Sequence, residues 1–132
     1  MSELLEGVVW LYRGVPSQSD EVDDVRTVSE VRPPRPERIG EYWRQVHVAG
    51  DTRTGYTSWT TDESLAQAAA EDCIDEEGLT GGVVIFRVRV ASIDEKRLFE
   101  GREDEDEWLI QGTVEEVEIS DGESEDEEDG DG

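Results

Sequence analysis

The pattern of apolar and polar residues predicts several short strands and one well-defined helix. Residues 8–12 form a continuous apolar run of strand length, followed by Gly14 and Pro16. Residues 83–90 begin as an apolar run and then alternate, so that Phe86, Val88 and Val90 share one face of the clearest strand in the sequence.

The segment 55–63 links a strand to a helix. Aromatic and hydroxyl residues alternate over 56–60, which is typical of a strand with two chemically different faces. Thr60 and Glu63 have the spacing of a capping box, which predicts a helix over 62–77 that ends at the glycine-rich residues 78–82. Leu65, Ala69 and Cys73 give this helix an apolar stripe.

The remaining segments are less regular. Valines recur every three residues over 20–31 and suggest a short helix, whereas the proline-rich residues 32–38 predict a surface loop. Residues 42–48 suit either a helical turn or an edge strand. Residues 108–110 and 114–119 predict two strands joined as a hairpin at Gln111-Gly112. The expected fold class is α+β, a mainly β domain with one main helix.

Length and composition indicate one domain and an acidic tail. The chain has 132 residues, and residues 120–132 contain only Ser, Asp, Glu and Gly. Such a segment has no apolar side chain to bury, so we expect a folded domain over 1–119 and a disordered tail over 120–132.

The charge of the chain is strongly negative. There are 36 acidic residues against 12 basic ones, a formal net charge of −24, and Lys96 is the single lysine. Acids spread over every segment favour adaptation to molar salt, where a Debye length of roughly 3 Å screens self-repulsion. The alternative is an acidic mimic of nucleic acid that occupies a basic protein. Direct binding to nucleic acid is not expected in either case.

Cysteine and histidine each occur once, as Cys73 and His47. A lone cysteine excludes an intramolecular disulfide and a thiolate metal cluster, and we expect Cys73 to be a small buried hydrophobe. A lone histidine argues against a zinc site and against a Ser/His catalytic pair, so no metal is expected. No signal peptide or long apolar run is apparent, which predicts a soluble cytoplasmic protein without membrane association.

Three short motifs occur in a fixed order. They are Tyr12-Arg13-Gly14 on the first strand, Ser58-Trp59-Thr60 on the strand that leads into the helix, and Glu105-Asp106-Glu107 before the apolar residues 108–110. This order resembles the Arg–Ser–Glu class of the ADP-ribosyltransferase superfamily, which transfers ADP-ribose from NAD. Trp59 replaces the middle residue of that family's Ser-Thr-Ser strand. The resemblance spans residues 12–114 and implies a split β-sheet with NAD in the cleft between its halves.

The resemblance also implies a role for each motif residue. Glu107 would stabilise the oxocarbenium-like state formed as the nicotinamide–ribose bond breaks. Arg13, beside Tyr12 and Gly14, would hold the phosphates or ribose of NAD. Ser58 would orient Glu107 by a hydrogen bond, with Thr60 as a weaker candidate. Trp59 or Tyr56 would stack on nicotinamide or line the pocket, although core packing explains both equally well.

The first glutamate of the pair suggests the acceptor. In the family, a glutamate at this position accompanies the use of arginine as the acceptor, so Glu105 would position or deprotonate an incoming guanidinium. The same Glu-x-Glu pattern also occurs two residues earlier, at Glu103 and Glu105. The expected function is mono-ADP-ribosyl transfer to a protein side chain, with arginine favoured. The alternatives are an NAD glycohydrolase on the same site and an inactive or mimic-like acidic binding module.

Overall fold

The fold is a small α+β domain, as the sequence predicts. The computed structural model describes residues 7–79, 81–102 and 106–120. Within these residues one antiparallel sheet of six strands is combined with three α-helices. In chain order the elements are β1 (Trp10–Pro16), α1 (Asp20–Val28), α2 (Glu41–Val48), β2 (Tyr56–Thr60), α3 (Glu63–Glu77), β3 (Val83–Arg89), two 3₁₀ turns (Val90–Ser92 and Glu95–Arg97), β4 (Leu98–Glu100), β5 (Glu107–Gln111) and β6 (Glu118–Ile119).

The sheet consists of two halves that meet at β1 and β2. Its strand order is β4-β5-β2-β1-β3-β6. β1 pairs with β3 along the full length of both strands, and β2 pairs with β5 in the same way. Among the described residues, β1 and β2 pair through Tyr12 opposite Thr60. This brief junction leaves room for a cleft beside it.

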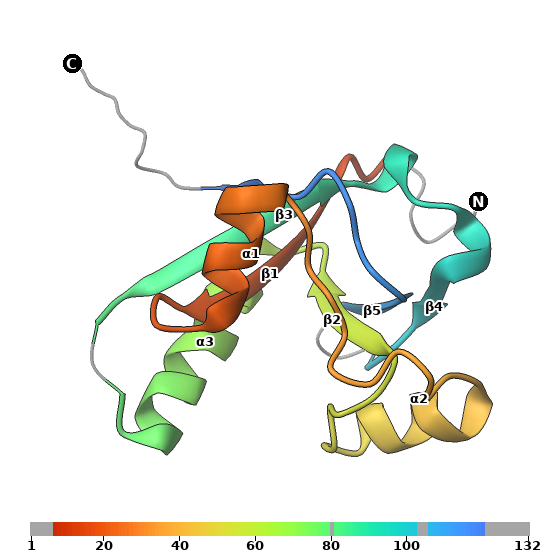
Figure 1. Ribbon diagram of the computed structural model, residues 1–132, viewed down its shortest axis with the longest axis horizontal. Coiled ribbons are helices and arrows are strands. Elements are labelled where there is room, and N and C mark those ends of the chain that lie inside the picture. The colour runs from red at the N-terminus through yellow and green to blue at the C-terminus, as the bar shows by residue number, and fades with distance from the viewer. Residues whose placement is uncertain (1–6, 80, 103–105, 121–132) are drawn as a thin grey trace.

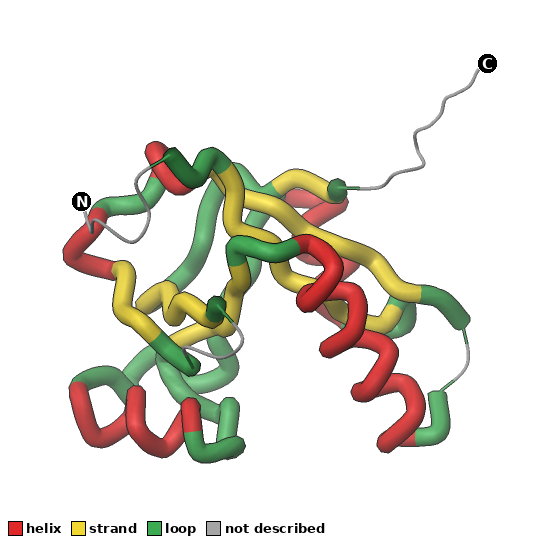
Figure 2. The backbone as a smooth tube through the Cα atoms, turned by 180° about the vertical axis from the view of Figure 1, so that it is seen from behind, coloured by secondary structure: helices red, strands yellow, loops and turns green. Residues whose placement is uncertain are grey.

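Helices cover the two faces of the β1–β3 half. In Figure 1 α1 lies in front of β1 and β3, and in Figure 2, seen from behind, α3 crosses the opposite face. The core lies on the α1 side, where Val22 and Val25 of the helix pack with Leu11, Val15 and Phe86 of the strands. α2 lies apart from both, below β2 in Figure 1.

Gly14 allows α3 to approach β1 closely. A Cβ atom placed on Gly14 would lie 2.0 Å from the carbonyl oxygen of Ala66 and 3.3 Å from the Cβ of Ala70. Ala66 and Ala70 are therefore the buried residues of α3. The expected stripe of Leu65, Ala69 and Cys73 is wrong: Ala69 is exposed, and Leu65 and Cys73 are only half-buried. The small side chains, and not the larger ones, decide which helix face contacts the strand.

The start of α3 differs from the expected capping box. The N-cap is Asp62, whose Oδ1 accepts a hydrogen bond of 2.9 Å from the backbone N–H of Ser64. Thr60 instead accepts a hydrogen bond from the backbone N–H of Asp62, at 3.1 Å, and belongs to β2. The helix ends as predicted, with Gly78 in the left-handed conformation at φ 66°.

α1 and α2 settle two open predictions. α1 is shorter than residues 20–31 and ends at Ser29, which adopts a left-handed conformation, while Val31 forms an isolated bridge to Val114. α2 shows that residues 42–48 are helical and not an edge strand.

The predicted hairpin at Gln111-Gly112 is wrong. Val114 pairs with Val31, and β6 pairs with β3 at the far edge of the sheet, through Phe86 opposite Ile119. Ser120 continues this edge, because its backbone N–H donates to the carbonyl oxygen of Ile85 at 2.7 Å.

Residues 121–132 of the predicted tail lie outside the described residues. Within the described part of the chain, none of the helices has the length and apolar character needed to traverse a bilayer.

Candidate active site

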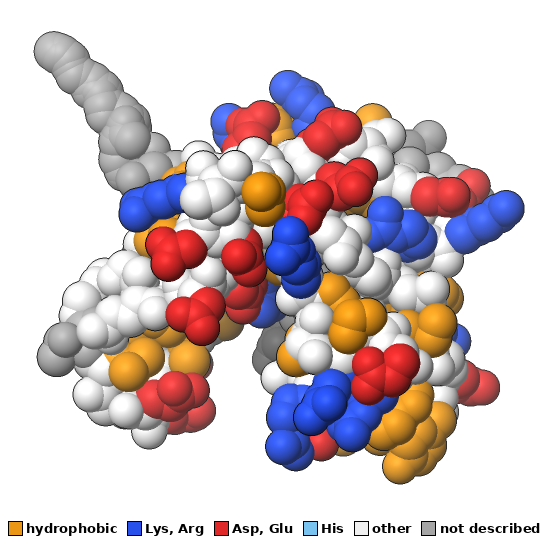
Figure 3. All heavy atoms as spheres, in the orientation of Figure 1, with side chains coloured by type: hydrophobic (Ala, Val, Ile, Leu, Met, Phe, Trp, Pro, Cys, Tyr) orange, Lys and Arg blue, Asp and Glu red, His pale blue; other side chains and the backbone are white. Residues whose placement is uncertain are grey.

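A cleft of about 290 Å³ opens beside the junction of β1 and β2. Figure 3 shows the surface hollowed between the part that carries α1 and α3 and the part that carries α2; a second pocket, whose lining includes Glu21 of α1 and His47 of α2, lies between these parts and shares Arg13 and Ser58 with the cleft. Three separate segments supply the lining of the cleft, together with one face of α3. The lining residues are Tyr12, Arg13, Gly14, Ser58, Trp59, Thr60, Leu65, Ala66, Ala68, Ala69, Asp72 and Glu107.

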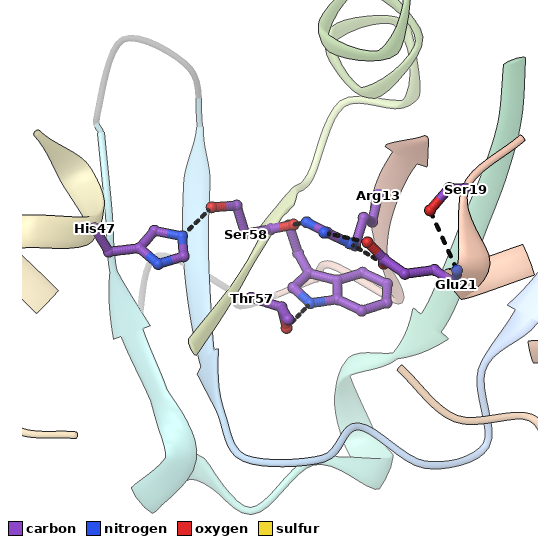
Figure 4. A network of polar contacts seen from close by, with 7 residues as sticks. Arg13, Ser19, Glu21, His47, Thr57 and Ser58 are labelled. Atoms are coloured by element: carbon purple, nitrogen blue, oxygen red, sulfur yellow. Dashed lines mark hydrogen bonds and ion pairs between the residues drawn. The ribbon is translucent and has the colours of Figure 1, made fainter. Parts of the chain in front are cut away.

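Arg13 supplies the positive charge of the cleft. Its Nε and Nη2 donate to the two carboxylate oxygens of Glu21 at 2.8 and 2.9 Å, and its Nη1 donates to the backbone carbonyl oxygen of Ser58 at 3.1 Å (Figure 4). Burial lowers the pKa of the guanidinium, but the charge and hydrogen bonds of Glu21 outweigh burial and raise the pKa above its ordinary value. Arg13 is therefore a fixed cation that joins β1, α1 and β2.

Glu21 is a site residue that sequence reasoning missed. It lies in the first turn of α1, one residue after the start of the helix. The only available signal was its place in the valine-spaced segment, where it is one of several acids. The fork-to-fork geometry with Arg13 arises because α1 folds back over β1, a long-range contact that no local pattern encodes.

The residues of β2 alternate between two faces of the strand. Trp59 packs in the core with 2% of its surface exposed, and its indole N–H donates to Thr57 at 2.8 Å. Ser58 and Thr60 lie on the other face, and Ser58, Trp59 and Thr60 all line the cleft. Trp59 is therefore both a core residue and part of the cleft lining.

Glu107 lies at the start of β5, directly opposite Thr60 of β2. Its Oε1 accepts a hydrogen bond of 2.9 Å from the backbone N–H of Arg102, which holds the carboxylate at the N-terminal end of β5. Gly101 packs against this side chain: a Cβ there would lie 2.6 Å from Oε1 of Glu107. The cross-strand neighbour of Glu107 is thus Thr60, whereas Ser58 is opposite Leu109.

Ser58 contacts a histidine where contact with Glu107 was expected. The Oγ of Ser58 lies 2.8 Å from Nε2 of His47 (Figure 4). Nδ1 of His47 lies 2.7 Å from Oγ1 of Thr54. The sequence argument concerned a catalytic Ser/His pair and had no signal that α2 would bring His47 to Ser58. His47 is therefore a second partner residue that sequence reasoning missed.

Buried surroundings lower the pKa of His47. Burial lowers its pKa, the charge of Glu107 raises it, Arg13 lowers it and Asp51 raises it, with a net shift below the ordinary value. Since both Glu107 and Arg13 act on this ring, His47 interacts electrostatically with two of the three charged residues that line the cleft.

Tyr56 serves the packing of α2 rather than the cleft. The side chain is fully buried, its hydroxyl oxygen accepts from the backbone N–H of Gly40 at 2.8 Å and from Arg44 at 3.0 Å, and its ring meets Phe99 edge-on.

Glu103 and Glu105 lie outside the described residues. Among the residues that are described, no three His, Cys, Asp or Glu side chains gather in a way that would bind a metal ion.

The cleft thus combines three kinds of surface. Arg13 is cationic, Glu107 and Asp72 are anionic, and Leu65, Ala66 and Ala69 of α3 form a largely apolar wall. Ligand pockets typically measure about 300–1,000 Å³, so this cleft suits one end of an extended ligand better than a whole dinucleotide. A ligand with a planar ring, an anionic group and a developing positive charge would match all three surfaces.

The chain matches no protein-family model, no curated protein and no solved structure. Any assignment of function therefore depends on the residues of the cleft and on their arrangement.

Proposed function

We propose that this protein is an NAD-dependent mono-ADP-ribosyltransferase that modifies a protein side chain. One observation carries the proposal: Arg13, Ser58, Thr60 and Glu107 come from three motifs far apart in the sequence and line the same cleft. These are the residues that the resemblance to the Arg–Ser–Glu class selects, and the selection used no structural information. A chance match of short motifs would not be expected to converge on one site.

The chemistry of the cleft supports NAD as the substrate. The dinucleotide carries an anionic pyrophosphate, for which Arg13 offers the N–H groups that Glu21 and Ser58 do not use. The planar ring of nicotinamide would lie against the apolar wall of α3. Glu107, fixed by the backbone of Arg102, would stabilise the positive charge that develops on ribose as nicotinamide leaves.

The acceptor is the less constrained part of the proposal. The resemblance favours arginine through Glu105, which would position or deprotonate the incoming guanidinium. We place the reaction in the cytoplasm, where the free thiol of Cys73 remains reduced.

The test combines NAD turnover with protein labelling in molar KCl. The parent protein is incubated with NAD labelled in the adenylate part and with a lysate, and both nicotinamide release and labelled protein are measured. Glu107→Gln should lower both by about a hundredfold or more, the scale of one electrostatic catalytic group. Glu100→Gln is the matched control, because Glu100 is an exposed residue of the adjacent strand β4, opposite Trp108.

Glu105→Gln separates transfer from hydrolysis. It should abolish labelling of protein and leave much of the nicotinamide release, because water needs less help than a guanidinium once the bond has opened. Nicotinamide release without labelled protein in the parent would indicate an NAD glycohydrolase. No turnover by the parent at any salt concentration would indicate a binding module. Full activity of Glu107→Gln would move the catalytic pair to Glu103 and Glu105.

A further inference from the structure

His47 lies behind the cleft and contacts it through Ser58. Only 4% of its surface is exposed, and the ring is held between two hydroxyl groups, Oγ1 of Thr54 at 2.7 Å and Oγ of Ser58 at 2.8 Å. In Figure 4 the ring points from α2 towards Ser58, on the side of β2 away from the Arg13–Glu21 pair. Both ring nitrogens are therefore within hydrogen-bond distance of a partner, and one partner is a cleft residue.

The tautomer of His47 sets the direction of the hydrogen bonds in this chain. Oγ1 of Thr54 accepts the backbone N–H of Tyr56 at 3.1 Å, and its own hydrogen can point to Nδ1 of His47. In the tautomer with its hydrogen on Nε2, the ring donates to Oγ of Ser58. The hydroxyl hydrogen of Ser58 remains for a group in the cleft. In this head-to-tail arrangement each hydrogen bond strengthens the next.

The charge of the ring matters as much as its hydrogen bonds. Glu107 of β5, Arg13 of β1 and Asp51 after α2 are the charged groups that act on it. A proton on His47 would add a positive charge that interacts with Glu107, the carboxylate beside which the proposed reaction develops its own positive charge. A neutral ring avoids this competing charge.

We propose that His47 is a positioning residue of the NAD site: it directs the hydroxyl hydrogen of Ser58 towards the ribose held by Glu107. This inference depends on the proposed function and adds to it a residue, on a separate helix, that touches neither substrate nor reacting atoms. The family resemblance gives Ser58 a partner in Glu107, whereas here the geometry gives it a partner in His47.

Two substitutions separate this role from simple packing. In His47→Gln the side-chain amide reaches the position of Nε2 and keeps a donor for Ser58, but it cannot take up a proton. In His47→Asn the amide reaches the position of Nδ1 and keeps the contact with Thr54, but it is too short for Ser58. We expect His47→Gln to retain most of the NAD turnover and His47→Asn to lose about tenfold, the rate equivalent of one hydrogen bond. Loss of packing alone would affect the two variants alike.

A double-mutant cycle tests whether His47 acts through Ser58. Ser58→Ala and His47→Asn should each lose about tenfold, and the double variant should lose about tenfold as well, because the second change removes nothing further. Additive losses of about a hundredfold would overturn the inference while the proposed function stands. In the parent, NAD turnover should fall at acid pH as His47 takes up a proton, and in His47→Gln this fall should occur at lower pH. The same pH profile in both proteins would also contradict the inference.

Proton NMR of the single histidine gives a readout that does not require turnover. Addition of NAD should shift the His47 ring signal in the parent protein and leave it unmoved in Ser58→Ala. A parent that neither consumes NAD nor shows this shift would overturn the proposed function and the inference together. A parent that consumes NAD with no shift would overturn the inference alone. Covalent labelling of Ser58 by a fluorophosphonate would also overturn it, since Ser58 would then be a nucleophile activated by His47.

Discussion

Nη1 of Arg13 donates a hydrogen bond of 3.1 Å to the backbone carbonyl oxygen of Ser58, across the place where the two halves of the sheet meet. In a continuous sheet a backbone N–H of the neighbouring strand would supply such a hydrogen bond. Here a side chain supplies it, and the same guanidinium is held by Glu21 of α1. The cleft can therefore stay open beside β1 without an unsatisfied carbonyl group.

Replacement of Arg13 by lysine should weaken both the fold and the site. A single ammonium cannot bond both oxygens of Glu21 and the carbonyl of Ser58, so we expect a loss of about 1–3 kcal/mol in the free energy of unfolding. Denaturant titration in molar KCl measures this loss. Arg26→Lys is the matched control, because Arg26 is an exposed residue in the last turn of α1. Equal stability of the two variants would show that the three hydrogen bonds of Arg13 contribute nothing.

Gly14→Ala should displace α3 from the sheet. The added Cβ would meet the carbonyl oxygen of Ala66 at 2.0 Å, and backbone on both sides leaves no flexible side chain to move aside. Overpacking of this kind costs about 1–3 kcal/mol or more. The melting temperature should drop, and NAD turnover should fall with it, because Gly14 and Ala66 both line the cleft.

Gly82→Ala provides the comparison for Gly14→Ala. A Cβ on Gly82 would meet nothing within 4 Å, so its melting temperature should remain near that of the parent. A drop of equal size in both variants would mean that general loss of glycine, and not the contact between Gly14 and Ala66, is responsible.

The pH dependence of stability should contain a contribution from His47. The pKa of the folded state lies below the ordinary value of 6.5, so on acidification the unfolded chain binds a proton that the folded chain resists. This contribution is fully present above the unfolded pKa and is lost as pH falls through 6.5 towards the folded pKa.

Thermal melts of the parent and of His47→Gln across this range test the sign. Glutamine does not titrate, so the advantage in melting temperature of the parent over His47→Gln should shrink as pH falls below the ordinary pKa of histidine. A gap that is constant with pH, or that widens on acidification, would contradict the burial of a neutral ring.

Salt should stabilise the whole domain. With a net charge of −24 and a single lysine, the folded chain repels itself in dilute buffer, and molar KCl screens that repulsion. The melting temperature should rise along a KCl series and follow ionic strength when NaCl replaces KCl. A melting temperature that is flat from about 0.1 M upward, where the Debye length is already near 10 Å, would contradict salt adaptation.

Local chemistry in the sequence determined the elements that need few distant partners. The alternation over β3 and the glycine that ends α3 each express a period or a backbone preference, and these predictions are confirmed. The strand expected at residues 8–12 is displaced, because β1 begins at Trp10 and continues through Gly14 to Pro16. The motif residues Arg13, Ser58 and Glu107 were also accessible from the sequence, because their order along the chain is itself sequence information.

Tertiary contact decided the rest. β6 pairs with β3 instead of β5, because burial of Val114 against Val31 draws the chain away from the predicted hairpin. Close approach over Gly14 selected Ala66 and Ala70 as the buried face of α3. The partners of the cleft residues, Glu21 for Arg13 and His47 for Ser58, come from helices whose position depends on packing across the whole sheet. A local pattern carries no information about such distant partners, because it specifies a residue's neighbours along the chain and not those across a folded sheet.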